Sequence, residues 1–302
     1  MFNNRRGGFD ALLQRKQPSS FSKFCSDPTY FLAQSIYKLP RRLPSTHSCP
    51  VTVVCISDTH NYQPDLPDGD ILVHAGDLTQ SGSLAELQRA LNWLNSQPHQ
   101  HKFVVAGNHD LILDASFPSA HFRDRQDIDW GSIVYLQNNT ATVQCARDRT
   151  IKIYGSPFSA RHGNWAFQYP PTIDIWEGTI PENTDILITH GPPKGHLDLN
   201  KLGCGFLLKE LWRLSTKPKL HVFGHIHEGY GIEKVSYDRV QKAYDDFILS
   251  GGGVLFLIYL WYVYILSALG IEKQLPSGWL VNASVVGGLR DEKRRGAVTI
   301  NI

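Results

Sequence analysis

Five short apolar segments of this chain each run directly into a polar motif that contains Asp, His or Asn. The segments are Val51–Ser57, Asp70–Ala75, Lys102–Ala106, Asp185–Thr189 and Leu220–Phe223. Their β-branched and mostly uninterrupted apolar character is typical of strands that are buried on both faces. Because sites in open α/β sheets collect beyond the carboxyl ends of the strands, the sequence predicts an α/β protein whose chemistry lies at one edge of a sheet.

The polar motifs use a restricted set of side chains. In chain order they are Ser57-Asp58-Thr59-His60, Gly76-Asp77, Gly107-Asn108-His109-Asp110, Thr189-His190-Gly191-Pro192 and Gly224-His225-Ile226-His227. Each motif alone is a weak signal, because an isolated Asp-x-His or His-x-His more often lies on a solvated surface. Together they predict a divalent metal site with carboxylate, imidazole and amide ligands. No cysteine lies in these motifs, which argues against a structural zinc cage.

Composition narrows the class of protein. The chain has 302 residues, 42% apolar and 19% charged, with a net charge of +2. This charge is too small to predict a nucleic-acid polymer as partner, since such binding requires a clustered basic surface. The five cysteines are widely spaced and lack a CxxC pair, which disfavours a disulfide framework and favours an intracellular, cytoplasmic location. No apolar signal segment opens the sequence, and residues 1–26 are expected to be disordered.

The remaining elements are predicted from periodicity and from capping residues. A helix at 27–39 has Asp27 as its cap, Pro28 in its first turn and an apolar face of Phe31, Leu32, Ile36 and Leu39. Further helices are expected at 83–95, where Ser83 and Glu86 have capping-box spacing, and at 206–214. The other predicted strands are 133–136, 140–145 and 150–154, expected to be antiparallel, and 279–283 and 296–301.

In this order the motifs resemble the signature of the calcineurin-like metallophosphoesterases. The resemblance covers roughly residues 51–230. Segments 185–198, 223–231 and 281–284 are also similar to the branch called metallophosphoesterase domain-containing proteins. The resemblance implies a four-layer α-β-β-α sandwich of two mixed sheets. We therefore expect an N-terminal extension over residues 1–50 and a metallophosphoesterase domain over 51–302 with an apolar insertion.

The resemblance also implies a role for each motif residue. The implied ligands are Asp58, His60 and His227 for one metal ion, Asn108, His190 and His225 for the other, and Asp77 as the bridge. His109 would stay off the metals and would stabilise the phosphoryl oxygens or protonate the leaving group, with Asp110 orienting its ring. The cofactors would be two divalent ions, Mn²⁺ foremost with Fe, Zn or Mg as alternatives, and the nucleophile a metal-bridging hydroxide.

The motif variants bear on the substrate. Protein Ser/Thr phosphatases of the same superfamily carry Gly-Asp-x-x-Asp-Arg-Gly and Gly-Asn-His-Glu, whereas this chain has Gly-Asp-Leu-Thr-Gln-Ser-Gly at 76–82 and Asp110. The resembled branch implies a small phosphate-ester substrate and cleavage of phosphodiesters, including cyclic nucleotides. The alternatives are a phosphomonoesterase on the same centre and a membrane-peripheral scaffold without turnover.

Segment 157–165 has two interpretations. Arg161 and His162 could contact a phosphate while Trp165 or Phe167 stacks on a base, or the segment is an ordinary loop that is packed by its aromatic side chains. Outside the motifs, His196 is expected near the site. Four other histidines are expected at the surface or in packing: His99, His101, His121 and His221. His74 is expected in the core.

Residues 247–271 carry no charged side chain, and 254–270 are almost wholly apolar and aromatic. A helix over the latter would be roughly 27 Å long, close to the thickness of a bilayer core. A single crossing is disfavoured because it would separate the last metal-binding motif from the closing strands. Three interpretations stay open: a helix at the membrane surface with Trp261 at the interface, a helix docked on the Phe31/Ile36 face as core or dimer contact, and a local gene-model error.

Overall fold

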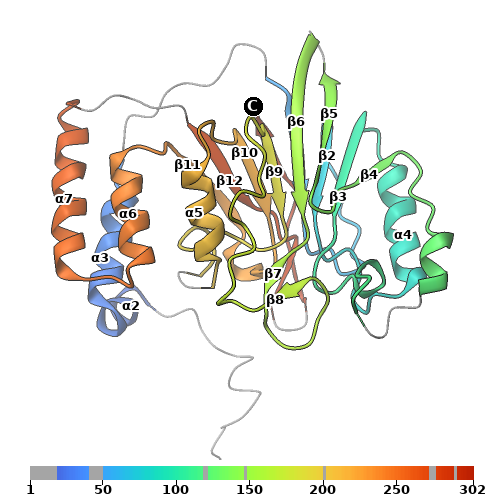
Figure 1. Cartoon of the computed structure of the whole chain (residues 1–302), viewed down its shortest axis with the longest axis horizontal. Helices are drawn as coiled ribbons and strands as arrows, with labels where there is room; N and C mark the ends of the chain where they lie inside the picture. Colours follow the sequence, from blue (N-terminus) through green and yellow to red (C-terminus); the bar gives the residue numbers. More distant parts are fainter. Residues whose placement is uncertain are drawn as a thin grey trace, which may run out of the picture.

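Two mixed β-sheets lie face to face at the centre of the molecule (Figure 1). This computed structural model describes residues 19–40, 50–117, 122–145, 148–199, 202–271, 277–288 and 291–302. The first sheet, in spatial order, consists of β15 (Val298–Asn301), β1 (Thr52–Ile56), β2 (Ile71–Ala75), β3 (His101–Val105) and β4 (Ile133–Tyr135). The second consists of β11 (Gly231–Val235), β12 (Gly278–Asn282), β10 (Leu220–Phe223), β9 (Ile186–Thr189), β6 (Arg149–Ser156) and β5 (Asn139–Cys145).

The strands that carry the polar motifs are neighbours within each sheet. β1, β2 and β3 run parallel to one another in the first sheet, and β9 and β10 run parallel in the second. Their carboxyl ends therefore bring the motif loops to the same end of the sandwich, as the sequence predicts.

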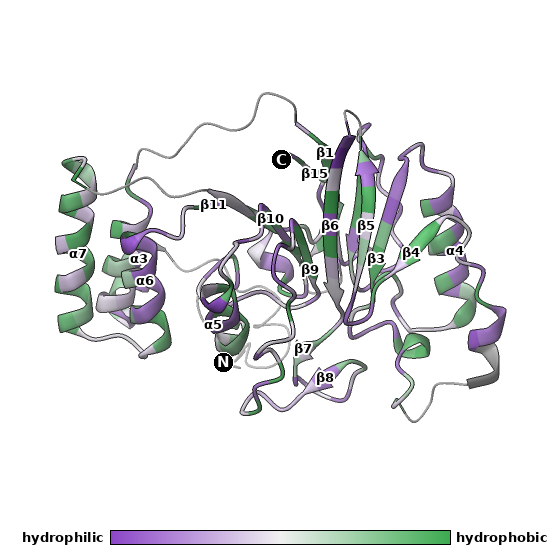
Figure 2. Cartoon of the chain, turned by 45° about the horizontal axis from the view of Figure 1, so that its top comes forward, coloured by the Kyte–Doolittle hydropathy of each residue, from purple (hydrophilic) through white to green (hydrophobic). Residues whose placement is uncertain are grey.

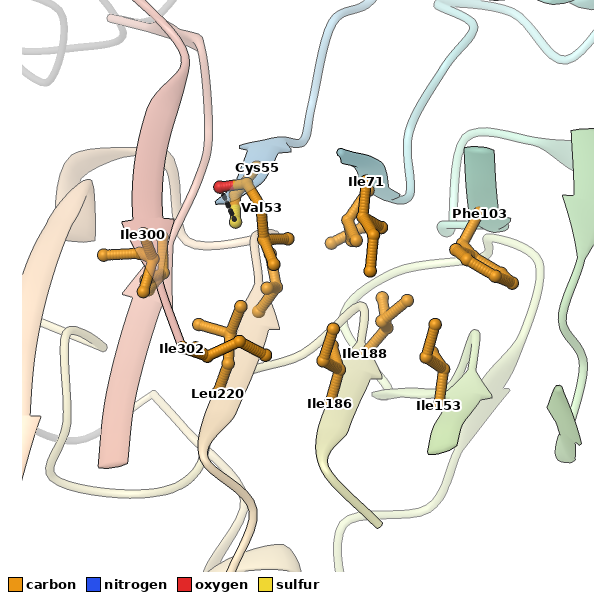
Figure 3. Packing of buried hydrophobic residues seen from close by; sticks show 14 of the residues in the cluster. Val53, Cys55, Ile71, Phe103, Ile153, Ile186, Ile188, Leu220, Ile300 and Ile302 are labelled. Carbon is orange, nitrogen blue, oxygen red and sulfur yellow. Dashed lines mark hydrogen bonds between the residues drawn. The ribbon is translucent and has the colours of Figure 1, made fainter. Parts of the chain in front are cut away.

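The facing sides of the sheets form the central core (Figure 3). Val53 of β1 packs there with Ile186 of β9 and Leu220 of β10, and all three are fully buried. Val54 and Ile56 of β1 point to the opposite face and join a second apolar cluster. Burial on both faces explains why these strands read as uninterrupted apolar runs rather than as an alternation.

One helix covers the outer face of each sheet. α4 (Leu84–Asn95) covers the first sheet and begins with the predicted capping box, in which Ser83 and Glu86 bond to each other's backbone N–H. α5 (Gly205–Arg213) covers the second sheet and buries Leu207 against it. These layers make the four-layer α-β-β-α sandwich that the resemblance implies.

The pairing of one strand differs from the prediction. β4 pairs parallel with β3 rather than antiparallel. Between them the chain passes through the 3₁₀ turns η1 (Leu111–Leu113) and η2 (Phe122–Asp127), and such a crossover connection returns the chain in the same direction. β5 and β6 do form the predicted antiparallel hairpin. Two short strand pairs were not predicted: β7 (Ser159–Ala160) with β8 (Gln168–Tyr169), and β13 (Val286–Gly287) with β14 (Lys293–Arg294).

A group of helices lies beyond the β11 edge of the second sheet (Figure 1). It contains α2 (Ser20–Ser26), α3 (Pro28–Tyr37), α6 (Arg239–Leu249) and α7 (Val254–Ala268). The expectation of disorder is wrong for residues 20–26, which form α2, while residues 1–18 lie outside the described part of the chain. We call these four helices the helical layer.

The helix predicted at 27–39 starts as expected but buries a different face. The Asp27 carboxylate accepts a hydrogen bond from Tyr30 N, and Pro28 lies in the first turn. The buried residues of α3 are Tyr30, Ala33 and Tyr37, whereas Leu32 and Leu39 of the predicted face are exposed. The reason is that α6 offers aromatic partners, which bury more apolar surface than leucines do.

The apolar insertion forms α7, which packs on α3, as one of the three interpretations predicts, and also on α6. Its contacts on α3 lie with the cluster of Tyr30, Ala33 and Tyr37 rather than on the predicted Phe31/Ile36 face. It buries Leu260 and Val263 there, and Ile36 lies at the margin of the same cluster. Figure 2 shows that α7 is largely apolar along its length, and side chains such as Leu255 and Tyr262 remain exposed. In the described part of the chain, no helix combines the length and apolarity that a bilayer crossing requires.

Candidate metal centre

The loop after β1 is tied to the loop after β2 by backbone hydrogen bonds. Asp58 N donates to Gly76 O at 2.8 Å, and His60 N donates to Asp77 O at 3.1 Å. Asp58, His60 and Asp77 have φ values of 50°, 43° and 55°, a left-handed conformation that costs a non-glycine residue on the order of 1 kcal/mol. Such strain concentrates at functional sites, where the surrounding contacts hold it in place.

Two glycines allow these loops to approach the histidine that follows β9. Gly76 has a φ of 102°, and a Cβ atom there would lie 2.4 Å from His190 Nδ1. A Cβ atom on Gly107 would lie 2.3 Å from Asp77 Oδ1. The glycines of the Gly-Asp and Gly-Asn-His-Asp motifs are therefore required for packing the site itself.

The donor atoms of Asp58, His60, Asp77 and His227 all lie within 4.8 Å of one another. His227 Nε2 is 3.2 Å from Asp58 Oδ1, and His60 Nε2 is 3.7 Å from Asp77 Oδ2. The first three residues are buried, while the side chain of His227 is 22% exposed. This group could hold one cation at the solvent-facing side of the centre.

A second group shares Asp77 with the first. The donor atoms of Asp77, His190 and His225 also lie within 4.8 Å of one another, and Asn108 Oδ1 lies 3.0 Å from His190 Nε2. The structure thus brings all seven sequence-predicted ligands together, divided between two groups as the resemblance implies. Their binding of metal stays a prediction.

The tautomer of His190 indicates where a cation would lie. Its Nδ1 faces the Ala75 carbonyl at 2.9 Å and so carries a proton. Its Nε2 faces two oxygens, Asn108 Oδ1 at 3.0 Å and Asp77 Oδ2 at 3.4 Å. Burial alone would lower the pKa of His190, but the Asp77 carboxylate raises it to about 9. A metal ion between these atoms would neutralise the charge of the same oxygens, so that His190 Nε2 would not have to carry a second proton.

The ring of His60 provides a second observation that these residues fit a cation. It is buried, and neither Nδ1 nor Nε2 has a hydrogen-bond partner among the residues that the structure describes. An unpaired buried polar atom costs about 1–3 kcal/mol. Burial lowers the pKa of His60, and it lowers that of His225 to about 4, so both rings are neutral and keep a lone pair for a metal.

His109 lies beside the centre without belonging to either donor group. Its backbone N–H donates to Asp77 Oδ1 at 2.7 Å, and its Nδ1 lies 2.9 Å from the Gln80 carbonyl oxygen. The ring stacks on Trp165 with centroids 4.1 Å apart and meets His60 edge-on at 4.7 Å. Because Nδ1 is used by a carbonyl, Nε2 is the atom left for a substrate.

The prediction that Asp110 orients His109 is wrong. The Asp110 carboxylate accepts hydrogen bonds from the backbone N–H of Gly107, Leu78 and Thr79 at 2.8, 3.2 and 2.9 Å. It therefore fixes the loop that carries Asp77. Burial, followed by the nearby Asp77 charge, raises the pKa of Asp110 to about 6. Adjacency in the sequence suggests His109 as the partner of Asp110, but the turn directs the Asp110 side chain away from the His109 ring.

Several residues near the centre were missed at the sequence level. Asp291 Oδ1 lies 3.5 Å from His227 Nδ1, on the side of the ring opposite Asp58. Ser284 Oγ donates to Asp58 Oδ2 at 2.8 Å, and Arg295 donates to the His227 carbonyl at 2.7 Å. The sequence marks the Asn-x-Ser segment at 282–284 only through the family resemblance. Its position just past a predicted strand is a usable signal.

The other predicted residues have mixed outcomes. His74 is buried as expected, with Nε2 3.0 Å from Thr59 Oγ1, and His99 and His221 are also buried. His121 lies outside the described residues. His196 is not at the centre, since it lies between Glu233 and Asp245. Arg161 and His162 are exposed at the rim of a cavity next to His225, and Phe167 is buried.

Residues 51–229 match the family model described as calcineurin-like phosphoesterase. The match covers more than half of the chain, and it contains all seven side chains of the two donor groups together with His109 and Asp110.

Three relatives illustrate the range of similarity. Human metallophosphoesterase domain-containing protein 1 is 39% identical over 207 residues, covering 59% of this chain and 61% of the relative. The UPF0046 protein K07C11.7 of Caenorhabditis elegans is 36% identical over 211 residues, covering 63% and 68%. A protein of Emericella nidulans named probable rhamnogalacturonate lyase C is 47% identical over 302 residues, which is 97% of this chain and 28% of that protein. The chain thus spans only part of these relatives.

Proposed function

The chain belongs to the calcineurin-like phosphoesterase family, and on that premise we propose that it is a metal-dependent phosphodiesterase. Its substrate would be a small phosphate diester, with cyclic nucleotides among the candidates. The observation that carries the proposal is the pair of donor groups that share the Asp77 carboxylate. A carboxylate shared in this way is the arrangement that holds two cations close enough to act on one phosphoryl group.

The chain would hold the ions with the seven motif side chains. When bound, such ions supply a water of lowered pKa and neutralise charge on the phosphoryl oxygens. Asp77 would be the shared ligand, while Asp58 and His190 are kept in position by Ser284 and by the Ala75 carbonyl. These contacts fix the donor atoms before an ion arrives, which reduces the cost of binding.

His109 would act on the substrate rather than on the ions. Its Nδ1–H is directed to the Gln80 carbonyl and its ring is fixed against Trp165. The free Nε2 could then hold a proton for the leaving group or contact a phosphoryl oxygen. The His109→Ala variant is expected to lose activity while keeping its metal content.

One observation favours a small ester over a phosphoprotein. The chain departs from the protein-phosphatase motifs at Gln80 and Ser81, where those motifs have Asp and Arg, and at Asp110, where they have Glu. A lyase reaction is not proposed. The part of this chain that matches the Emericella protein includes the phosphoesterase region and represents 28% of that protein.

The test uses protein from which metal has been removed and then restored. Mn²⁺, Fe²⁺, Zn²⁺ and Mg²⁺ are added separately, and bound metal is measured by mass spectrometry. Hydrolysis of bis-p-nitrophenyl phosphate is compared with that of p-nitrophenyl phosphate. We expect metal-stimulated turnover with preference for the diester. Preference for the monoester would favour a phosphomonoesterase, and bound metal without turnover of either would favour a scaffold.

A further inference from the structure

A cavity of about 470 Å³ opens directly beside the second donor group. His225 lines it, and so does Gly191, the residue after His190. The remaining walls come from the segment that includes β7 and β8, and from the start of α5, at the lower end of the sandwich in Figure 1. A group attached to a phosphoryl centre held by these histidines could therefore extend into this cavity.

We propose that this cavity binds one of the two organic groups of the ester, and that it selects a flat, mostly apolar group with one hydrogen-bonding atom. The inference rests on the proposed phosphoesterase function and assigns a substrate class to it. Its size falls within the range of about 300–1,000 Å³ that is usual for sites of small organic ligands.

The cavity walls are apolar and aromatic. Phe158, Tyr169 and Trp176 form a chain of edge-to-face rings, with successive centroids 6.4 Å apart. Leu207 and Ile226 add aliphatic surface. Such walls gain free energy by excluding water from an apolar ligand, and they would gain little from a bare phosphate or a sugar.

The aromatic walls are also held in place. Trp176 Nε1 donates to the Tyr169 hydroxyl at 3.0 Å, and both side chains are buried. Tyr169 and Trp176 belong to one buried apolar cluster beneath α5, and the partly buried Phe158 packs against it. The cavity thus has fixed walls before a ligand enters, which lowers the entropic cost of binding.

Ser159 supplies the polar element. It is 1% exposed, it borders the cavity, and its hydroxyl has no hydrogen-bond partner among the described residues. A buried hydroxyl without a partner is costly, so a ligand atom that accepts from it would recover that cost. Arg161 and His162 lie at the exposed rim, where they could attract an anionic ester without touching the apolar floor.

The test measures dissociation constants by calorimetry on metal-loaded protein, so that it does not depend on turnover. The ligands are methyl phosphate, phenyl phosphate and 1-naphthyl phosphate, each with a single organic group. We expect the affinity to rise at least tenfold from methyl to naphthyl, because an aryl group buries much more apolar surface. Equal affinities would overturn the inference, even if the protein hydrolyses bis-p-nitrophenyl phosphate. If the affinity rises tenfold from methyl to naphthyl phosphate but the protein does not hydrolyse bis-p-nitrophenyl phosphate, the result counts against the proposed function instead.

Two variants locate the preference in this cavity. Ala160→Phe places a large side chain at its border and is expected to reduce the naphthyl preference at least fivefold, with metal content unchanged. Ala85→Phe, on the exposed side of α4, is the matched control and should keep the preference. If Ala160→Phe keeps it too, the aryl group binds elsewhere and the assignment fails.

Ser159→Ala separates the polar element from the apolar one. A quinolinyl phosphate, which carries a ring nitrogen, should bind several-fold more weakly to this variant than to the wild type. Binding of 1-naphthyl phosphate should be unchanged or stronger, because the variant removes an unpaired hydroxyl. Equal weakening for both ligands would show that Ser159 acts through packing and would overturn its role as the hydrogen-bond donor.

Discussion

Two largely buried histidine–carboxylate clusters lie in the part of the chain that the structure describes, and they differ in whether their side chains satisfy one another's hydrogen-bonding groups. In the cluster that joins the helical layer to the second sheet, His196 Nδ1 lies 2.7 Å from Glu233 Oε1 and Nε2 lies 2.9 Å from Asp245 Oδ1. Tyr37 donates to the same Glu233 oxygen at 2.9 Å, and Trp212 Nε1 donates to Asp245 Oδ2 at 2.8 Å. Both ring nitrogens of this histidine are hydrogen-bonded.

The candidate metal centre contains the same residue types, but the lone pairs of some of its polar atoms have no hydrogen-bond donor. His60 has no hydrogen-bond partner among the described residues at either nitrogen, and His190 Nε2 faces two oxygens. A cation would correct both defects, whereas a cation at His196 would have to displace existing partners. In these two clusters the residue types are the same, and the unpaired ring nitrogens of His60 distinguish the candidate metal centre from the ion pair at His196.

The largest expected effect is at the residue that the two donor groups share. Asp77→Ala should reduce turnover of bis-p-nitrophenyl phosphate by on the order of 10³-fold or more, since metal charge contributes several kcal/mol to the transition state. Metal content should fall below two ions per chain. Asp245→Asn is the control, because it alters the other cluster and should keep both ions. An Asp77→Ala protein with two ions and normal turnover would contradict the assignment of the centre.

The second effect concerns stability rather than metal. His196→Ala removes the cationic partner of the buried Asp245 and of Glu233, whose side chain is 20% exposed. Loss of one partner of a buried ion pair costs about 3–5 kcal/mol in comparable cases. The free energy of unfolding, measured with urea on metal-loaded protein, should fall by that amount. Metal content of the folded variant should equal that of the wild type. Loss of metal together with stability would show that the clusters are coupled and would break the comparison.

The sequence predicts which side chains meet at the candidate centre, because its signals are local. Each motif follows an apolar strand within one or two residues, so Asp58 or His225 can be placed at a strand end without knowledge of the rest of the fold. Parallel neighbours then bring those ends together. The four-layer sandwich is what the family resemblance implies, and the alternation of strands and helices agrees with it.

Most of the parts that the sequence does not predict depend on long-range contacts. α6 is an exception, because Asp238 caps its first turn and its buried apolar residues lie at helical spacing: Val240, Ala243, Tyr244 and Phe247. Only its packing on α3, more than 200 residues earlier in the chain, is long-range. Asp291 lies near a two-residue strand pair, which has no readable periodicity. Sequence adjacency predicts a contact between Asp110 and His109, whereas the partners of Asp110 come from the loop after β2. Proximity to His190 in the sequence predicts His196 near the centre, whereas its partners lie on β11 and α6.

A smaller effect on the metal centre is expected from Asp291. Its carboxylate lies 3.5 Å from His227 Nδ1, so it would orient the ring that presents Nε2 to the first donor group. Removing an outer partner of this kind costs about 10–100-fold in metal affinity. Asp291→Asn should weaken binding of one ion by that factor, as measured by titration with a competing chelator. Equal weakening of both ions would show that Asp291 acts on the whole loop.

The smallest effect is a difference in how the two clusters respond to pH in metal-loaded protein. Burial alone would lower the pKa of His196, but Glu233 and Asp245 raise it well above 6.5. Burial would raise the pKa of Glu233, and His196 holds it below 4.5. A histidine with a raised pKa stabilises fully below its unfolded value and loses this contribution as pH rises through its folded value. For Glu233 the contribution is present above 4.5 and is lost as pH falls through its folded value.

Stability of the metal-loaded wild type should therefore fall by about 1.4 kcal/mol per pH unit above pH 6.5, relative to His196→Ala, until the folded pKa is passed. The histidines of the centre would not add to this slope, because an imidazole that binds metal is already neutral. Burial alone would lower the pKa values of His190 and His227, but Asp77 raises that of His190 to about 9 and Asp58 raises that of His227 to about 10. After removal of metal, both histidines should therefore add slopes of the same sign. Urea denaturation at pH 6, 7 and 8, with and without metal, measures both. A slope that metal leaves unchanged would mean that these two histidines do not bind it.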